Sequence, residues 1–360
     1  MQKIKNKKII TFFIFIFLFT SINIYSNTIF GGIEIGSKGV KITILDVENA
    51  KKNVFTLKEF WTTNVGIAKG ISIDGNLAND DIEAASKVVL ENYNKLLNEY
   101  KIEDKNIFIV ASSGVGIAKN TDVLVDKIRL LTHKEMEVIS SKLEAKLMFR
   151  GSIIKKLYLN SLLLDIGGGN TKGGYVEIRN EDINVFYPFN INLGTITLTE
   201  KINKEVVNKE DINAFTAKLD AFVPKLDADV KQMYLERPEY KEKKNIYLSG
   251  GAVWAFFTLS NNTGTENFSE FTYEDVLYYD AVIKNNFKKF TDLSATNPEI
   301  SRVLKTYSQK HLIAANTILL TSLSNLGDLE TKKLYFVKQG QIAWLLSYVA
   351  DSAKGSKVIY

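Results

Sequence analysis

A glycine-rich turn between two short apolar runs is the sequence feature that most restricts how this chain can fold. The first run covers residues 162–166 and contains Asp165, and the second covers residues 175–178. Because the residues between them are rich in glycine, the pattern predicts a β-hairpin. Glycine lets the backbone approach a ligand closely, and consecutive turn N–H groups form a concave site for phosphate oxygens. The motif alone is equally consistent with a tight hairpin that carries a chance acidic residue.

The same plan occurs once earlier in the chain. Strand-like runs over residues 28–35 and 40–47 are joined by the sequence Gly-Ser-Lys-Gly, and Glu34 stands 131 residues before Asp165 in the equivalent place. Two hairpins of one plan predict two copies of an α/β unit, each with a turn that faces phosphate across a shared cleft. Two unrelated hairpins are the alternative.

A helix expected over residues 141–150 carries the candidate general base. Lys142, Lys146 and Arg150 recur every four residues along one side, whereas Glu144 lies beside the apolar side. Because an apolar environment disfavours the charged form of a carboxyl group, the pKa of Glu144 is expected to be raised toward the range of a general base. An ordinary amphipathic helix with a solvated glutamate is the alternative.

The rest of the chain alternates between strand and helix patterns, which predicts an α/β protein. Residues 207–244 are expected to form a solvated helical segment interrupted at Pro224 and Pro238, and residues 259–270 a polar loop. The other predicted strands are residues 54–65, 106–111, 135–139, 182–191, 245–249 and 333–337. The other predicted helices are residues 79–100, 121–131, 252–258, 273–287, 299–307 and 309–326, one that begins near residue 196, and one after residue 340.

Two further glycines, Gly250 and Gly251, lie between a predicted strand and the N-terminus of a predicted helix. Backbone N–H groups at such a junction bind anions well. A Gly-Gly pair is also a common packing device, so this signal is weak by itself.

The N-terminus has the plan of a secretory signal peptide. Four lysines within residues 3–8 precede an apolar run over residues 9–19, and a small polar end follows at residues 24–26. The run is shorter than the about 20 residues of a membrane span, which favours cleavage over a retained membrane anchor through residues 9–22. Cleavage would remove four of the five net positive charges, so a general attraction to nucleic acid is not indicated.

The chain has no cysteine and only two histidines, His133 and His311, which are far apart. Disulfides, a cysteine nucleophile and a zinc site are therefore not expected. Each histidine is interpreted as a surface or helix-capping residue.

These motifs together resemble the exopolyphosphatase / guanosine pentaphosphate phosphohydrolase (Ppx/GppA) family of the actin-like superfamily. The matching stretches are residues 33–37, 111–120, 139–151, 165–171, 193–200 and 250–251. The resemblance implies a first actin-like (ribonuclease-H-like) domain over residues 27–151 and a second over 152–338, flanking a phosphate-binding cleft. It leaves residues 339–360 as a C-terminal helix that packs back on the first domain.

The resemblance also implies roles for the site residues. Asp165 and Glu34 would hold Mg²⁺ through water, and Glu144 would be the base that orients water toward a terminal phosphorus. The phosphate-binding residues would be Gly36, Ser37, Gly167, Gly168, Gly169, Asn170, Thr171, Lys172, Gly250 and Gly251. Lys142, Lys146 and Arg150 are candidates for binding the rest of a polyanionic chain.

Five residues depart from the family's pattern. Glu34 stands for the usual aspartate, Lys38 for asparagine, Gly116 for a substrate-facing arginine, and Leu143 for an acid. Lys172 stands for a glutamate that helps to place metal or water. This last change inverts a charge in the cleft, so it could disable Mg²⁺-dependent hydrolysis or bind phosphate directly.

Three functions fit these residues. The first is an exported exopolyphosphatase-like phosphohydrolase that releases terminal phosphate from polyphosphate or a related polyphosphorylated molecule. The second is a catalytically degenerate polyphosphate- or nucleotide-binding protein of the same fold. The third, an ATP-dependent enzyme, is disfavoured because ATP is scarce outside the cytosol. A homodimer is an option that the sequence leaves open.

Overall fold

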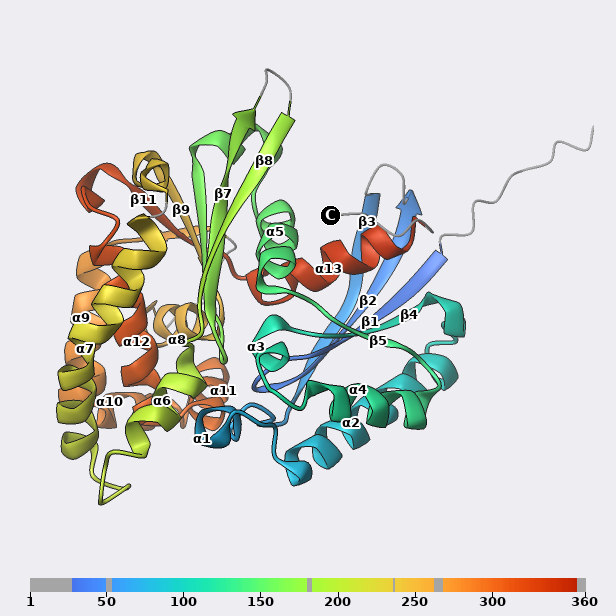
Figure 1. The fold of residues 1–360 in the computed structure, drawn as a ribbon, viewed down its shortest axis with the longest axis horizontal. Helices are drawn as coiled ribbons and strands as arrows, with labels where there is room; N and C mark the ends of the chain where they lie inside the picture. Colours follow the sequence, from blue (N-terminus) through green and yellow to red (C-terminus); the bar gives the residue numbers. More distant parts are fainter. Residues whose placement is uncertain (1–27, 50–53, 180–182, 236, 262–267, 355–360) are drawn as a thin grey trace, which may run out of the picture.

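The computed structural model describes residues 28–49, 54–179, 183–235, 237–261 and 268–354, and it shows an α/β protein with two sheets (Figure 1). The predicted signal segment, residues 1–26, lies outside the described residues. So do Asp182, the predicted first residue of one strand, and residues 262–267 of the predicted loop. Within the described residues, no helix has both the length and the apolar composition needed to cross a membrane.

The first sheet has the strand order β3-β2-β1-β4-β5. β1, β2 and β3 are antiparallel neighbours, whereas β4 runs parallel to β1 and β5 parallel to β4. Its strands are β1 Thr28–Ile35, β2 Gly39–Asn49, β3 Val54–Asn64, β4 Ile107–Ala111 and β5 Met136–Val138. The helices of this half are α1 Ile71–Asp74, α2 Asn79–Asn98, α3 Ser113–Gly116, α4 Thr121–Thr132 and α5 Ser141–Ser152.

The second sheet repeats this plan and adds one edge strand, in the order β10-β11-β9-β6-β7-β8. β6, β7 and β8 are antiparallel, and β9 and β11 continue the sheet in parallel from β6. Its strands are β6 Ser161–Ile166, β7 Thr171–Arg179, β8 Ile183–Ile191, β9 Asn245–Ser249, β10 Ser269–Phe271 and β11 Lys333–Phe336. The two sheets therefore share one strand order around equivalent hairpins, as the repeated motif predicted.

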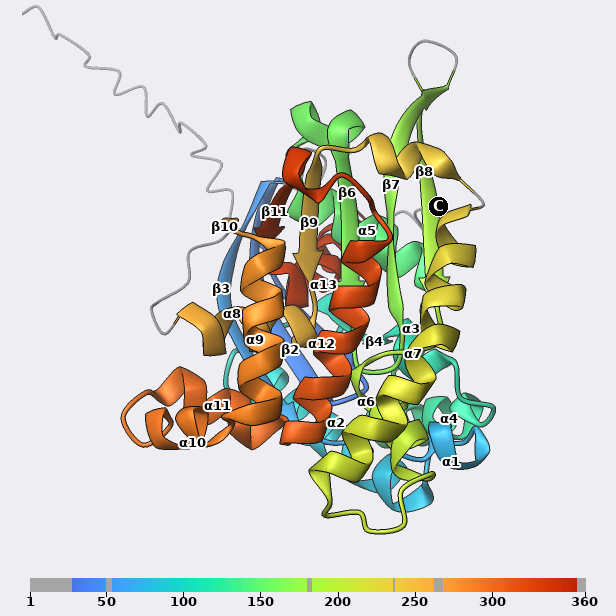
Figure 2. The ribbon, with the colours of Figure 1, turned by 90° about the vertical axis from the view of Figure 1, so that its left-hand side faces the viewer.

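Helices cover both faces of the second sheet (Figure 2). α7, α9 and α12 lie on its outer face, while α5 and α13 lie between the two sheets. The helices of this half are α6 Thr195–Asn203, α7 Ile212–Leu235, α8 Gly251–Asn261, α9 Tyr273–Asn285, α10 Lys288–Leu293, α11 Pro298–Thr306, α12 Gln309–Ser324 and α13 Gly340–Ser352. Short 3₁₀ turns cover Asp104–Asn106, Lys155–Asn160, Pro238–Glu242 and Leu329–Thr331.

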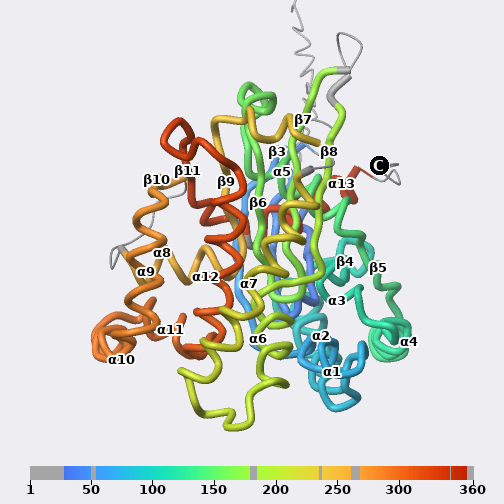
Figure 3. The backbone as a smooth tube through the Cα atoms, turned by 60° about the vertical axis from the view of Figure 1, so that its left-hand side comes forward, coloured from blue at the N-terminus to red at the C-terminus, as the bar shows by residue number. Residues whose placement is uncertain are grey.

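One apolar cluster joins the two halves. It contains Phe30 from the first sheet, Leu163 from the second, Leu147 from α5 and Trp344 from α13, all buried. α13 packs against α5 and against β1 and β2, so the last described helix contacts the first sheet. The halves also meet where α1 lies beside α6 (Figure 3), and Lys204 Nζ donates to the carbonyl of Ile73 there at 3.0 Å. The domain limits given above stay predictions.

The prediction for residues 207–244 was wrong in two respects. α7 runs through Pro224 without ending, and its apolar side is buried in the core of the second half through Phe215, Leu219, Leu226 and Val230. Proline removes one helical hydrogen bond, but burial of four large apolar side chains stabilises the helix on both sides of it. The break at Pro238 is real, since that residue begins a separate 3₁₀ turn.

Four short elements were not predicted. β10 lies in the expected loop and pairs antiparallel with β11, and α1, α3 and α10 are helices of four to six residues. Elements this short have too little periodicity to be recognised from sequence. The interpretation of the histidines is confirmed, since His133 is the left-handed C-cap of α4 and His311 belongs to the capping box of α12.

Gly250 holds the junction between β9 and α8 in a conformation that other residues rarely adopt. Its φ is +96°, and an added Cβ would lie 2.2 Å from the carbonyl oxygen of Ile166. We expect Gly250→Ala to lower the free energy of unfolding by about 3 kcal/mol, from backbone strain together with the clash.

Gly327 provides the matched control for this substitution, because its φ is +64° and nothing lies within 4 Å of an added Cβ. Gly327→Ala should therefore cost only about 1 kcal/mol. Urea unfolding of both variants tests the difference, and equal losses would contradict the assigned clash.

Candidate active site

The two glycine-rich turns face each other across a cleft of about 430 Å³. Each turn is closed by the same hydrogen bond, from Gly36 N–H to the Gly39 carbonyl at 2.9 Å and from Gly167 N–H to the Asn170 carbonyl at 3.0 Å. The turns are in contact, because a Cβ on Gly168 would lie 2.8 Å from the Cβ of Ser37. The two hairpins thus form opposite sides of one site.

A third backbone segment completes the floor of the cleft. α3 brings Gly114 so close to the second turn that a Cβ on Gly169 would lie 2.4 Å from the Gly114 carbonyl oxygen. From behind, α6 supports the same turn, because Thr195 N–H and Ile196 N–H donate to the carbonyls of Gly167 and Gly168 at 2.9 and 2.8 Å. Glycine is therefore required at these positions by the close packing of the backbone segments as well as by the close approach of a ligand.

Nine of the ten predicted phosphate-binding residues line the cleft; Thr171 does not. Its hydroxyl instead donates to the carbonyl of Leu193 at 2.8 Å, which anchors the start of β7 to the segment before α6. The Asn170 amide donates to Ser113 Oγ at 2.9 Å and to Asn190 Oδ1 at 3.2 Å. The side chains of Asn170 and Thr171 thus hold the second glycine turn in place.

Glu144 is buried at the cleft with both carboxylate oxygens engaged. Ser140 Oγ caps α5 by accepting from Leu143 N–H, which places Glu144 in the first turn of that helix. Its Oε2 accepts from Ser113 N–H at 2.8 Å, and its Oε1 lies 3.0 Å from Lys172 Nζ. The carboxylate was expected to have apolar surroundings. It instead contacts polar groups of α3 and of the second hairpin, against which α5 packs.

Lys172 is the central cation of the cleft. Only 3% of it is exposed, and its Nζ lies 2.8 Å from Asp165 Oδ2 and 3.0 Å from Glu144 Oε1. It also donates to Asn170 Oδ1 at 3.2 Å. Although burial alone would lower the pKa of Lys172, the charges of Asp165 and Glu144 outweigh it and raise that pKa above its ordinary value. The ammonium is held charged.

Glu34, the predicted ligand in the first hairpin, has a lysine partner too. Lys41 Nζ donates to its two oxygens at 3.0 and 3.2 Å, and only 2% of Glu34 is exposed. Burial raises the pKa of Glu34 to about 7, Lys41 opposes this rise, and the charge of Glu144 adds to it. Glu34 and Glu144 are thus close enough to influence each other.

The side chains as they lie do not form the expected Mg²⁺ site. Asp165 and Glu34 each have a lysine ammonium within hydrogen-bond distance, so a divalent cation bound to either carboxylate would be repelled at short range by that ammonium. Across the described ranges, no group of three or more His, Asp or Glu side chains is arranged to hold a metal ion.

Several cleft residues were not predicted because tertiary packing alone brings them to the site. The cleft is also lined by Trp254 and Tyr307 from the second half and by Phe60 from β3. The Arg302 guanidinium lies 4.9 Å above the Trp254 ring centre, and Lys38 Nζ lies 6.0 Å from that of Tyr307. Such aromatic and cationic residues from separate elements leave no local motif in the sequence.

Four residues singled out in the sequence lie elsewhere. Lys142, Lys146 and Arg150 do not line the cleft, and Arg150 forms an ion pair with Asp351 of α13. By helical periodicity they lie on the side of α5 away from Glu144, where Arg150 pairs with α13 and Lys142 is exposed. Gly116 is also outside the cleft lining, and a Cβ there would lie 2.8 Å from Val138 Cγ1. This close contact with β5 explains why a larger residue is absent.

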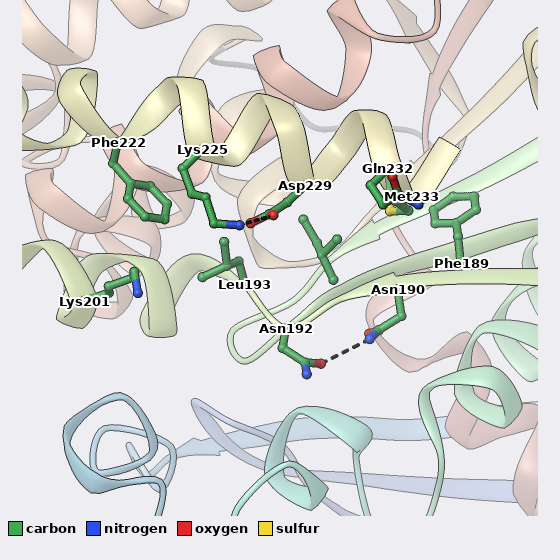
Figure 4. Close-up of a pocket in the computed structure, with 11 residues that line it drawn as sticks. Phe189, Asn190, Asn192, Leu193, Lys201, Phe222, Lys225, Asp229, Gln232 and Met233 are labelled. Atoms are coloured by element: carbon green, nitrogen blue, oxygen red, sulfur yellow. Dashed lines mark hydrogen bonds and ion pairs between the residues drawn. The ribbon is translucent and has the colours of Figure 1, made fainter. Parts of the chain in front are cut away.

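A second pocket, of about 500 Å³, lies between the end of β8, α6 and α7 (Figure 4). Figure 4 shows Lys225 paired with Asp229 along α7, and Asn190 donating to Asn192 at 3.1 Å on the opposite side. Asn190 also accepts from Asn170. The pocket is therefore linked to the second glycine turn through one hydrogen bond, but it contains none of the residues predicted for phosphate binding.

The raised pKa of Glu34 predicts a specific pH dependence of stability. Since the folded state keeps this proton up to about pH 7 and the unfolded state loses it near 4.5, the contribution of Glu34 is fully present below pH 4.5 and is lost as the pH rises to 7. Glu34→Gln removes the titration, so the free energy of unfolding of the variant relative to the unmodified protein should rise by about 3 kcal/mol over this interval. Urea unfolding at several pH values measures this difference, and a relative fall would contradict it.

Comparison with solved structures shows the class of fold. The Aquifex aeolicus member of the Ppx/GppA protein family is 19% identical with a TM-score of 0.64, covering 91% of this chain and 99% of that one. An exopolyphosphatase from Cytophaga hutchinsonii is 16% identical with a TM-score of 0.60, covering 89% and 98%. The chain therefore has the actin-like α/β fold of these proteins, with its glycine turns at the cleft.

Comparison of the sequence identifies the family within this class. The sequence model of the Ppx/GppA phosphatase family matches residues 47–240, more than half of the chain, and this protein belongs to that family. A bifunctional 3-dehydroquinate synthase/phosphatase of Fusobacterium nucleatum is 28% identical over 200 residues, which are 54% of this chain and 29% of that protein.

A guanosine-5'-triphosphate,3'-diphosphate pyrophosphatase of Pseudoalteromonas atlantica is also similar, with 26% identity over 203 residues. The match covers 56% of this chain and 38% of the relative. The chain thus aligns with less than two fifths of either relative's own length.

Proposed function

We propose that this chain is a phosphohydrolase that releases the terminal phosphate of polyphosphate or of a related polyphosphorylated small molecule, with Glu144 as general base. The observation that carries the proposal is the position of Glu144. Its carboxylate is buried in the cleft, fixed by Ser113 N–H at 2.8 Å, and lines the same cavity as both glycine turns.

In this proposal, different residues of the cleft carry out different parts of phosphoryl transfer. The turns over residues 36–39 and 167–170 offer backbone N–H groups to the phosphate oxygens. Glu144 orients a water for in-line attack and accepts its proton, while Lys172 balances the negative charge of the transferred group. Positioning and charge neutralisation are most of what this reaction requires from a protein.

The Lys172 ammonium has three N–H donors, and three oxygens already surround it. A phosphate oxygen reaches Nζ only by displacing one of them, and displacement of Glu144 would release its Oε1 to bind water. Binding of substrate and activation of the base are thereby coupled in this proposal.

A catalytically degenerate binding protein is the second candidate, and the same ion pairs favour it. If Glu144 keeps Lys172 as its partner when ligand is bound, its oxygens are not available to water. The cleft would then bind the phosphates on the glycine turns without cleaving them.

We also infer that the protein is exported, from the signal-like pattern of residues 1–26. Export favours polyphosphate over the guanosine polyphosphates, which are cytosolic metabolites. The aromatic residues that line the cleft, Phe60, Trp254 and Tyr307, would offer stacking surfaces to a nucleotide base, so nucleotides are kept in the panel of substrates to be tested.

Release of orthophosphate from long-chain polyphosphate, tripolyphosphate, a guanosine polyphosphate and ATP by the purified protein tests the proposal. We expect release from the inorganic chains to exceed release from the nucleotides. Binding of the chains without any release would establish the second candidate, and release from ATP alone would contradict both.

A further inference from the structure

The two hairpins carry the same cross-strand pair of acid and lysine. In the first, Glu34 is the register partner of Lys41, and in the second, Asp165 is the register partner of Lys172. Both pairs form ion pairs, at 3.0 and 2.8 Å. The repeat therefore extends beyond the glycine turns to one cation on each side of the cleft.

The two lysines are placed where each predicted metal ligand would bind its ion. Lys41 Nζ contacts both oxygens of Glu34, and Lys172 Nζ is surrounded by oxygens of Asp165, Glu144 and Asn170. A cluster of carboxylate and amide oxygens around one centre is the environment that a hard divalent cation prefers. Here an ammonium stands at that centre.

The two ammonium groups also supply the charge that such an ion would bring. Glu144 and Asp165 are almost completely buried and would repel each other without the Lys172 ammonium between them, and Glu34, equally buried, is paired with Lys41. Lys41 and Lys172 together carry the two positive charges of one divalent ion, and both line the cleft.

We propose that Lys41 and Lys172 replace the divalent cation of this cleft, so that the protein binds the phosphate groups of its substrate without metal. The part that concerns phosphate rests on the proposed function. The part that concerns metal stands on the ion pairs alone, and the experiment has one arm for each.

The first arm measures binding of Mn²⁺ by electron paramagnetic resonance. The unmodified protein should leave the signal of free Mn²⁺ unchanged. Lys172→Glu places a carboxylate beside Glu144 and Asp165, so it should bind one Mn²⁺ ion with an affinity at least about tenfold above that of the unmodified protein. Lys142→Glu has the same change of charge at an exposed site of α5 outside the cleft and should behave like the unmodified protein. One tightly bound ion in the unmodified protein would overturn the proposal.

The second arm measures binding of tripolyphosphate by calorimetry with excess EDTA or with Mg²⁺. The affinity should agree within about twofold between the two conditions, and Lys172→Gln and Lys41→Gln should each weaken it about tenfold or more. Lys142→Gln is the matched control and should leave it unchanged. Binding that is lost in EDTA would overturn the proposal.

Circular dichroism first establishes that each variant is folded. If Lys172→Glu does not fold, Lys41→Glu takes its place in the Mn²⁺ measurement, because its side chain is 24% exposed and carries less of the burial cost. If tripolyphosphate binds in EDTA but no phosphate is ever released, the proposed hydrolase fails and this inference stands. If the unmodified protein binds Mn²⁺ tightly and phosphate is released, the proposed hydrolase stands and this inference fails.

Discussion

Replacing Glu144 with glutamine is expected to reduce the release of orthophosphate from polyphosphate by at least about 100-fold. Glutamine keeps the shape of the side chain and accepts from Ser113 N–H, but it cannot take a proton from water. Lys172 retains Asp165 as a partner at 2.8 Å and phosphate no longer has to displace a charged Glu144 oxygen from it, so the affinity for polyphosphate should not fall. Initial rates and binding isotherms for the same preparation separate the two effects.

Glu83→Gln serves as the control, since Glu83 is exposed on α2 and pairs with Lys127 on the surface. Its rate should equal that of the unmodified protein. If Glu144→Gln retains full activity, Glu144 is not the base, and the cleft must activate water through another group.

Replacing Lys172 with methionine is expected to have the largest effect on stability. The substitution leaves Asp165 and Glu144 buried without the ammonium that now lies within 3.0 Å of each. Loss of one partner of a buried ion pair costs about 3–5 kcal/mol, because the remaining charge is neither solvated nor paired. The free energy of unfolding from urea denaturation measures the loss.

Two further variants make this prediction specific. Lys105→Met removes a lysine whose pair with Glu103 is exposed, so it should cost less than about 1 kcal/mol. Adding Asp165→Asn to Lys172→Met removes one of the stranded charges and should recover part of the loss. If Lys172→Met costs no more than Lys105→Met, the ion pairs of the cleft do not stabilise the fold.

Local patterns were sufficient to predict both hairpins of the site. The glycines of residues 36–39 and 167–169 and the apolar runs beside them are contiguous in sequence, and the turn chemistry follows from these residues alone. The equivalence of Glu34 and Asp165 was also visible, because it depends only on spacing. The structure confirms two sheets of one strand order around these hairpins.

The partners of the charged groups could not be predicted in the same way. The charge inversion at Lys172 is apparent from the sequence, but its position between Asp165 and Glu144 depends on how α5 packs against the second hairpin. The same packing turns Arg150 toward Asp351 on α13, away from the substrate to which sequence reasoning assigned it. Helix periodicity tells which residues share a side and not what that side faces.

Long-range packing explains the remaining differences. Pro224 breaks no helix because burial of the apolar side of α7 outweighs one lost hydrogen bond. The aromatic residues of the cleft come from elements more than 180 positions apart, β3 and the stretch from α8 to the end of α11, so no window of sequence contains them.

The most direct test of the central claim is a ³¹P NMR time course of polyphosphate with stoichiometric protein. The account predicts that the unmodified protein broadens the terminal phosphate signals and then produces orthophosphate, while Glu144→Gln broadens the same signals and produces none. Unchanged spectra for both proteins, or equal release by both, would contradict the assignment of this cleft as a polyphosphate-hydrolysing site with Glu144 as its base.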